Sequence, residues 1–224
     1  MKLRRLAVRA ALGIVVASVV PIAILREVPP VTSAFMLAVQ WPFARGDDAC
    51  ARVDYDWVPR RAISPNVFRA MIAAEDQRFA EHSGFDFDAI EKALEEAAKK
   101  GRARGASTIS QQVAKNLLLW SGHNFMRKAL EAWLTLWIEV LWPKQRILEV
   151  YVNIAQFGHC TFGVGAASRT FFHSDPASLS LEQAALLAAV LPNPVERRVE
   201  APARRVRARA AWIAGQARRV AVPR

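Results

Sequence analysis

Apolar residues recur along this chain at the spacing of amphipathic α-helices. The clearest case lies between Asn124 and Pro143, where apolar residues stand three and four positions apart: Leu130, Trp133, Leu134, Trp137, Ile138 and Leu141. This spacing places the side chains on one face of a helix. We therefore expect a helix that begins at Asn124, buries that face and ends before Pro143, because proline cannot continue a helix.

Capping patterns predict the neighbouring helices. Ser64 followed by Pro65 is typical of an N-cap with a proline at the first helical position. Asp86 precedes a run with early acids and late lysines, and Gly101 follows it as a C-cap. The sequence thus predicts a mainly α-helical protein, in which residues 26–60 form a connecting segment with a short strand or two. Further helices are expected near residues 107–119, 144–153, 184–191 and 201–220.

The N-terminal pattern predicts a membrane anchor. Residues 10–25 carry no charged side chain, and four basic residues precede them: Lys2, Arg4, Arg5 and Arg9. A full span needs about 20 apolar residues, which residues 6–25 supply if Arg9 reaches back to the interface. The positive flank predicts a cytoplasmic N-terminus. A cleaved signal peptide is the alternative, but no A-x-A cleavage site precedes Arg26 and Glu27, so we favour an uncleaved anchor.

Composition and charge narrow the possible partners. Hydrophobic residues make up 53 % of the 224 residues, which suits contact with a membrane. The formal net charge is +11, and residues 196–224 supply +7 of it through nine arginines and two glutamates. A basic tail can meet nucleic acid or anionic lipid. The predicted anchor favours lipid and base-reading motifs are missing, so no nucleic-acid partner is expected.

Several chemical signatures are missing from the sequence. There is no phosphate loop, no H-E-x-x-H and no paired C-x-x-C, and no metal site is predicted. No serine precedes a lysine by three positions and there is no K-T-G, so a penicillin-sensitive transpeptidase module is not expected. Residues 163–168 resemble a dinucleotide turn only weakly, because no convincing strand precedes them. Cys50 and Cys160 show no framework spacing, and we expect two free thiols, although an oxidising compartment would permit a bridge.

Two glutamates are candidate catalytic groups. Glu75, followed by Asp76, closes an apolar helix, and a carboxylate backed by apolar residues can act as a base. Its alternative interpretation is a solvated helix end. Glu131 borders the apolar stripe described above, four residues after Arg127. Its alternative is an ordinary surface ion pair worth about 0.2–0.5 kcal/mol.

A polar run at a predicted helix start offers a third candidate feature. Residues 105–120 read GASTISQQVAKNLLLW, with hydroxyl, amide and lysine side chains gathered at the start. A capped amphipathic helix with a wet face would explain this composition. A helix N-terminus beside a lysine would also suit a phosphate group.

Five blocks in this order match a known family. They are EDQRFAEHSGFD (75–86), GASTISQQVAKN (105–116), RKALE (127–131), KQRILEVYVN (144–153), and GAASRTFF (165–172) with LPNP (191–194). Through them the chain resembles glycosyltransferase family 51, in its monofunctional biosynthetic peptidoglycan transglycosylase branch. The resemblance implies a lysozyme-like helical domain with a small mobile membrane-proximal lobe, preceded by one transmembrane helix. It divides the chain into an anchor (1–30), a connecting segment (31–60), a glycosyltransferase domain (61–200) and a basic C-terminal helix or tail (201–224).

The resemblance also implies roles for individual residues. Glu75 would be the general base that activates the 4-hydroxyl of lipid II, and Glu131 would organise the donor pyrophosphate directly or through a divalent cation. Lys115 and Arg127 would neutralise the departing pyrophosphate. The two sugar sites would be shaped by Asp76, Ser107, Gln111, Gln112 and Asn116. Phe79, His82 and Lys128 complete the expected substrate-binding set.

The expected reaction is inverting polymerisation of lipid II into β-1,4-linked glycan strands. No cofactor is obligatory, but Mg²⁺ or Mn²⁺ could sit at the donor pyrophosphate. The expected location is the inner membrane, single-pass, with the catalytic domain in the periplasm, where other cell-wall proteins are possible partners. One position departs from the family pattern, since His123 stands where relatives often carry an arginine. A lytic muramidase on the same scaffold and a non-catalytic membrane scaffold are the rival interpretations.

Overall fold

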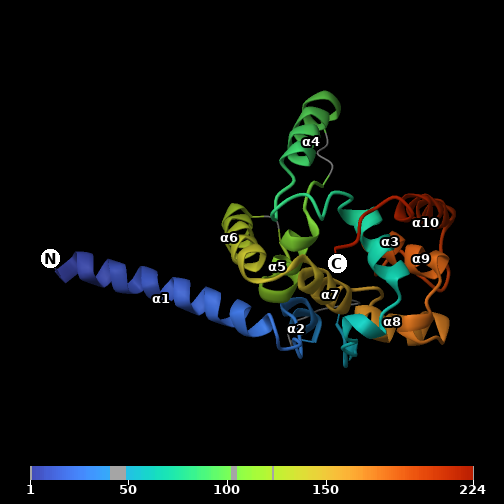
Figure 1. The fold of residues 1–224 in the computed structure, drawn as a ribbon, viewed down its shortest axis with the longest axis horizontal. Coiled ribbons are helices and arrows are strands. Elements are labelled where there is room, and N and C mark those ends of the chain that lie inside the picture. Colours follow the sequence, from blue (N-terminus) through green and yellow to red (C-terminus); the bar gives the residue numbers. More distant parts are fainter. Residues whose placement is uncertain (1, 41–48, 102–104, 123, 224) are drawn as a thin grey trace.

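The structure is a computed structural model that describes residues 2–40, 49–101, 105–122 and 124–223. It is mainly α-helical, as predicted. Figure 1 shows a helical body from which the N-terminal helix projects. The first half of the chain contributes α1 (Lys2–Leu25), α2 (Ala34–Gln40), β1 (Asp54–Tyr55), α3 (Pro65–Glu75), α4 (Phe87–Lys100) and α5 (Ile109–Leu118). The second half contributes α6 (Phe125–Leu141), α7 (Lys144–Ile154), β2 (Thr161–Phe162), α8 (Gly163–Phe172), α9 (Leu181–Val190) and α10 (Arg204–Ala217).

The predicted caps form as expected. The Ser64 hydroxyl accepts from the Asn66 amide at the start of α3, and the Asp86 carboxylate accepts from the Ala89 amide in α4. Gly101 ends α4 in the left-handed conformation, with φ of 66°. Asn124 caps α6, and capping boxes begin α5 and α9. The starts of α3, α4 and α6 were therefore predictable from short-range chemistry. The Thr108 capping box of α5 was not predicted.

Two α-helices were not predicted. The connecting segment contains α2, and α8 begins at the glycine-rich sequence that resembled a dinucleotide turn. The glycines there serve close packing. A Cβ on Gly163 would lie 2.5 Å from the carbonyl oxygen of Asn153, and one on Gly165 would lie 2.7 Å from that of Asp56. Gly163 also has a φ of 78°, which side-chain-bearing residues rarely adopt.

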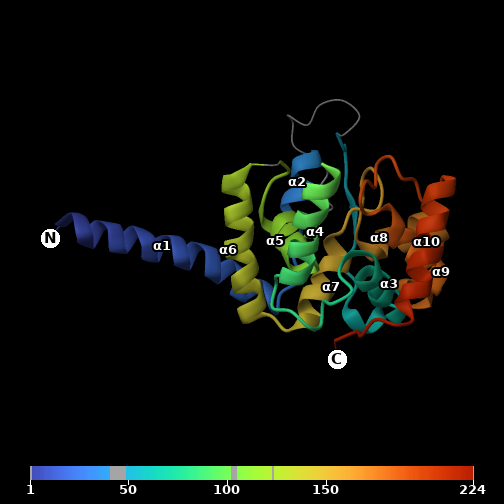
Figure 2. The same cartoon turned by 90° about the horizontal axis from the view of Figure 1, so that it is seen from above.

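The core forms where α5 packs on α6 and α7, and where α3 packs on α9 and α10. Figure 2 shows these helices as successive layers from α6 to α10. Helix α10 buries Val206, Ile213 and Ala217, so the basic C-terminal helix packs on the helical body. The division of the chain at residue 200 stays a prediction.

Helix α1 forms at the predicted anchor but does not confirm it as a span. Among the helices of the described residues, none is long and apolar enough to cross a membrane. Basic residues occupy the first turns of α1, which shortens its apolar run. Its C-terminal half is fixed to the body, because Trp133 Nε1 donates to Ser18 Oγ at 3.1 Å and Trp142 Nε1 donates to the Ile22 carbonyl at 2.7 Å.

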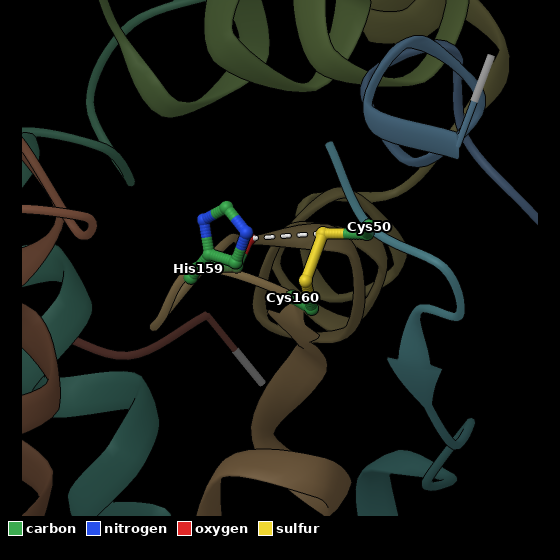
Figure 3. Close-up of side chains that lie close together, drawn as sticks. All are labelled: Cys50, His159 and Cys160. Carbon is green, nitrogen blue, oxygen red and sulfur yellow. Dashed lines mark hydrogen bonds between the residues drawn. A yellow bond between two sulfur atoms is a disulfide. The ribbon is translucent and has the colours of Figure 1, made fainter. Parts of the chain in front are cut away.

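The expectation of two free thiols is wrong. Cys50 and Cys160 form a disulfide, with Cα atoms 5.8 Å apart (Figure 3). No local pattern indicates this bridge, because the two cysteines are separated by 110 positions. Parallel pairing of β1 with β2 brings them together, since the Asp54 amide donates to the Cys160 carbonyl at 2.9 Å.

Replacing both cysteines by serine should lower the free energy of unfolding by about 2–4 kcal/mol, because the cross-link restricts the unfolded chain. Chemical denaturation of the variant and the oxidised wild type measures this difference. A non-reduced digest of the wild type should contain a peptide that joins Cys50 to Cys160. Two separate alkylated peptides in that digest would contradict the bridge.

Candidate active site

Glu75 ends α3 at the edge of a cleft. Its Oε2 atom accepts a hydrogen bond from Gln112 Nε2 of α5 at 2.9 Å. Gln112 is held in turn by the Tyr151 hydroxyl, which donates to Gln112 Oε1 at 3.3 Å. The Glu75 side chain is 16 % exposed, so it is largely buried but reaches solvent. The alternative interpretation of Glu75, as a solvated charge at the end of a helix, is therefore wrong.

Arginines from the C-terminal part of the chain face the same carboxylate. Arg209 of α10 lies with Nη2 3.6 Å from Glu75 Oε1, and it also donates to the Ala74 carbonyl at 3.3 Å. Burial raises the pKa of the Glu75 carboxyl above its ordinary value. The Gln112 hydrogen bond and then the charges of Arg209, Lys115 and Arg197 oppose this increase. A carboxylate with these opposed influences suits a general base.

The cleft around Glu75 has a volume of about 580 Å³. It lies between the end of α3, the start of α5 and the C-terminal segment, and it contains more cationic than anionic side chains. A smaller hollow of about 270 Å³ continues from Glu75 and Asp76 toward α4. The polar residues that line the larger cleft are Glu75, Asp76, Gln77, Ser107, Gln112, Lys115, Arg197 and Arg209, and Trp212 lies beside them.

Asp76 fixes α5 relative to α3. Its Oδ2 accepts from the Ile109 backbone amide at 3.0 Å, at the start of α5. His82 Nε2 lies 2.9 Å from Asp76 Oδ1, and the His82 side chain is 8 % exposed. Asp76 therefore holds the helix that carries Gln112 and Lys115, and His82 contacts the same carboxylate.

Glu131 lies in a buried cluster of opposite charges. Arg127 Nη1 donates to Glu131 Oε2 at 2.6 Å, and the two side chains are 7 % and 3 % exposed. Lys128 Nζ contacts the other carboxylate oxygen and lies 3.4 Å from Ser107 Oγ. Arg127 Nε also donates to the Gly122 carbonyl at 2.8 Å. The ordinary surface ion pair is thus ruled out as a description of Glu131.

Lys115 interacts electrostatically with both Glu75 and Glu131. Burial lowers the pKa of its ammonium group, and the carboxylates of Glu131 and Glu75 oppose that decrease. Its Nζ lies 5.5 Å from the centre of the Phe35 ring of α2. A partly desolvated cation at this place can interact strongly with an anionic ligand.

Not every expected site residue faces the cleft. Phe79 is fully buried, and Lys144 Nζ lies 4.4 Å from the centre of its ring. Gln111 belongs to the α5 capping box. Asn116 has a buried Oδ1 without a hydrogen-bond partner in the part of the chain that is described. His123 lies outside the described residues. Phe79 and Gln111 were expected to bind substrate because they lie in the family motifs. In the structure, Phe79 belongs to the core and Gln111 stabilises the start of α5.

The contribution of α10 to the cleft was not predicted from the sequence. Arg209 and Trp212 reach the cleft although the sequence indicated only a basic, helix-prone tail. Arg197 was also read as part of that tail, and burial lowers the pKa of its guanidinium. The buried positions of α10 lie at Val206, Ile213 and Ala217, and this spacing is the signal that could have indicated a packed helix.

Comparison with known proteins agrees with this geometry. The family model described as Transglycosylase matches residues 47–218. A biosynthetic peptidoglycan transglycosylase of Salmonella typhimurium is 50 % identical over 219 residues, covering 97 % of this chain and 90 % of its own. The protein of the same name from Haemophilus influenzae is 50 % identical over 194 residues, covering 86 % and 79 %. That from Xylella fastidiosa strain 9a5c is 48 % identical over 208 residues, covering 89 % and 82 %.

The matched region contains the cleft, both glutamates and α10, and it spans most of the chain. The sequence identity of 50 % over 219 residues indicates that this chain and the Salmonella typhimurium protein share one fold. The chain therefore belongs to the transglycosylase family and is a glycosyltransferase.

Proposed function

We propose that the protein polymerises lipid II into β-1,4-linked glycan strands of peptidoglycan, with inversion at the donor sugar. The observation that carries this proposal is the buried Glu75 carboxylate at a cleft lined by cations. A hydrolytic muramidase would need a carboxylic acid to protonate its leaving group, whereas a pyrophosphate leaves as an anion. Lys115, Arg197 and Arg209 support anion binding in the cleft.

In the proposed reaction, Glu75 accepts the proton of the acceptor 4-hydroxyl. That oxygen forms a bond to the anomeric carbon of the growing strand. The bond from this carbon to the pyrophosphate oxygen breaks, and the pyrophosphate takes the electron pair. Lys115 would stabilise the departing charge, which is the largest electrostatic demand of the step.

Glu131 supports the donor side through its neighbours. Arg127 and Lys128 each contact one of its carboxylate oxygens, so two cations already occupy the side of Glu131 that Mg²⁺ or Mn²⁺ would need. We assign no step to a divalent cation. Glu131 would instead hold the two cations in place, with Lys128, whose side chain is 47 % exposed, available to the pyrophosphate.

We also propose an envelope location with the catalytic domain in the periplasm. The disulfide supports this because such bridges persist in oxidising compartments. The exposed apolar side chains of α1, including Leu12 and Ile14, support its association with the inner membrane. The single-pass arrangement, the lysozyme-like arrangement with its mobile lobe and the protein partners stay predictions.

Purified protein incubated with labelled lipid II should give a polymer that lysozyme digests. Purified sacculi should remain intact under the same conditions. Sizing of the products measures both outcomes. Release of soluble muropeptides without polymer would favour the lytic alternative, and absence of any turnover would favour the non-catalytic scaffold.

Arg209→Gln should lower the polymerisation rate by about fivefold near neutral pH, the equivalent of ~1 kcal/mol. Loss of the positive charge raises the pKa of Glu75, and the base must be deprotonated. The acidic limb of the pH–rate profile should therefore move to higher pH. Arg207→Gln is the matched control, because Arg207 is exposed on the same helix. Identical profiles for the two variants would exclude a role for Arg209 in positioning Glu75.

A further inference from the structure

A histidine side chain that can bind a metal lies beside the disulfide. His159 precedes Cys160, and one ligand atom from each of Cys50, His159 and Cys160 lies within 4.8 Å of the others. Figure 3 shows the imidazole beside the two sulfur atoms. Among the residues that the structure describes, this is the one such group of histidine, cysteine and acidic side chains.

The backbone holds these three residues in position independently of the sulfur–sulfur bond. Strand pairing fixes Cys160 next to Asp54. Gln156 Nε2 donates to the carbonyls of Gly158 and His159 at 3.1 and 2.8 Å, which closes the turn before β2. The Cys50 amide donates to the Val39 carbonyl at 2.8 Å. Breaking the disulfide therefore leaves the two thiols and the imidazole close together.

The donor atoms suit a thiophilic cation. Thiolate sulfur and imidazole nitrogen bind Zn²⁺ at ~2.3 and ~2.0–2.1 Å, so tetrahedral ligands stand roughly 3.5–3.8 Å apart. Rotation of three side chains can reach that spacing from donor atoms already within 4.8 Å, and the 5.8 Å between the two cysteine Cα atoms allows it. Cys50 is 5 % exposed, whereas His159 and Cys160 are partly open to solvent, which gives a cation a route of entry.

We propose that Cys50, His159 and Cys160 form a site with two states: a disulfide when oxidised, and a site for Zn²⁺ or a similar thiophilic cation when reduced. A dithiol reductant supplies two electrons and two protons to the cystine and itself becomes a cyclic disulfide. The cation then displaces both thiol protons and binds two thiolates and one imidazole nitrogen. In either state Cys50, which precedes β1, stays linked to Cys160, which precedes β2. The connection between these two segments would therefore persist after reduction.

Cobalt(II) titration of the full-length protein tests the site, because Co²⁺ reports thiolate ligation by its absorption. The protein is reduced with dithiothreitol, separated from it without oxygen, and titrated with Co²⁺. We expect one equivalent to bind, with an intense thiolate-to-cobalt band that Zn²⁺ removes. The oxidised protein should show no band. His159→Ala should weaken binding by at least ~10-fold, since even outer partners of metal ligands contribute that much.

His173→Asn is the matched control. His173 ends α8 with a φ of 50°, a conformation that asparagine tolerates, and it is absent from the cysteine cluster. This variant should bind Co²⁺ as tightly as the wild type. Circular dichroism of the reduced protein is recorded alongside each titration. A folded reduced protein without the band, helix loss on reduction, or unchanged binding in His159→Ala would each overturn the proposal.

Discussion

Glu75→Gln is expected to lower the polymerisation rate by about 10²–10⁴-fold while the protein remains folded. Glutamine has the same shape and retains an oxygen that can accept from Gln112, so the 2.9 Å hydrogen bond can persist. It cannot take the proton of the acceptor hydroxyl. Because burial disfavours the charged carboxylate, its removal should also cost little stability. Rates from labelled lipid II and the melting temperature measure the two effects.

Glu81→Gln provides the matched control for this experiment. Glu81 lies in the same EDQRFAEH sequence, but its side chain is 63 % exposed and pairs with Arg78 at 2.9 Å. Its replacement should leave the rate within twofold or so, because surface ion pairs contribute little. A folded Glu75→Gln protein that turns over like this control would refute the proposed base.

The helices were predictable because their signals are local. Ser64, Asp86 and Asn124 each cap a helix through atoms two or three residues away, and the structure confirms all three. The disulfide was not predictable by the same means. It depends on a two-residue parallel pairing between β1 and β2, which no periodicity in the sequence announces.

The candidate site divides in the same way. Glu75 and Gln112 were selected from motifs, and the structure brings them into contact across 37 positions of sequence. Arg209 was not selected, because a run of arginines in an alanine-rich helix resembles a solvated tail. Its contribution arises only when α10 packs against α3 and α9. Long-range packing therefore decides which charges of a basic segment enter the cleft.

Burial changes the expectation for Glu131 most. In sequence, the pair with Arg127 resembles any helical i, i+4 pair, but the structure leaves the two side chains 3 % and 7 % exposed. Removing one partner of a buried pair leaves an uncompensated charge. Glu131 also holds Lys128, so its loss should disturb two cations together.

Glu131→Gln is therefore expected to reduce the free energy of unfolding by about 3–5 kcal/mol and to lower the polymerisation rate. Glu95→Gln is the matched control, because Glu95 and Lys99 form an i, i+4 pair that is 60 % and 74 % exposed. That change should cost at most about 0.5 kcal/mol. Denaturant titrations at one pH and one salt concentration measure both. Equal losses in the two variants would mean that the Glu131 cluster behaves as a surface pair.

A double variant separates the structural and catalytic roles of this cluster. Arg127→Met with Glu131→Leu removes both buried charges and fills similar volume, so stability should recover in part relative to Glu131→Gln. Lys128 can then turn toward solvent, since its side chain is 47 % exposed. The polymerisation rate should nevertheless stay low, because Arg127 is gone and Lys128 is no longer held beside the donor pyrophosphate. Recovery of the rate along with stability would show that Glu131 acts only in folding.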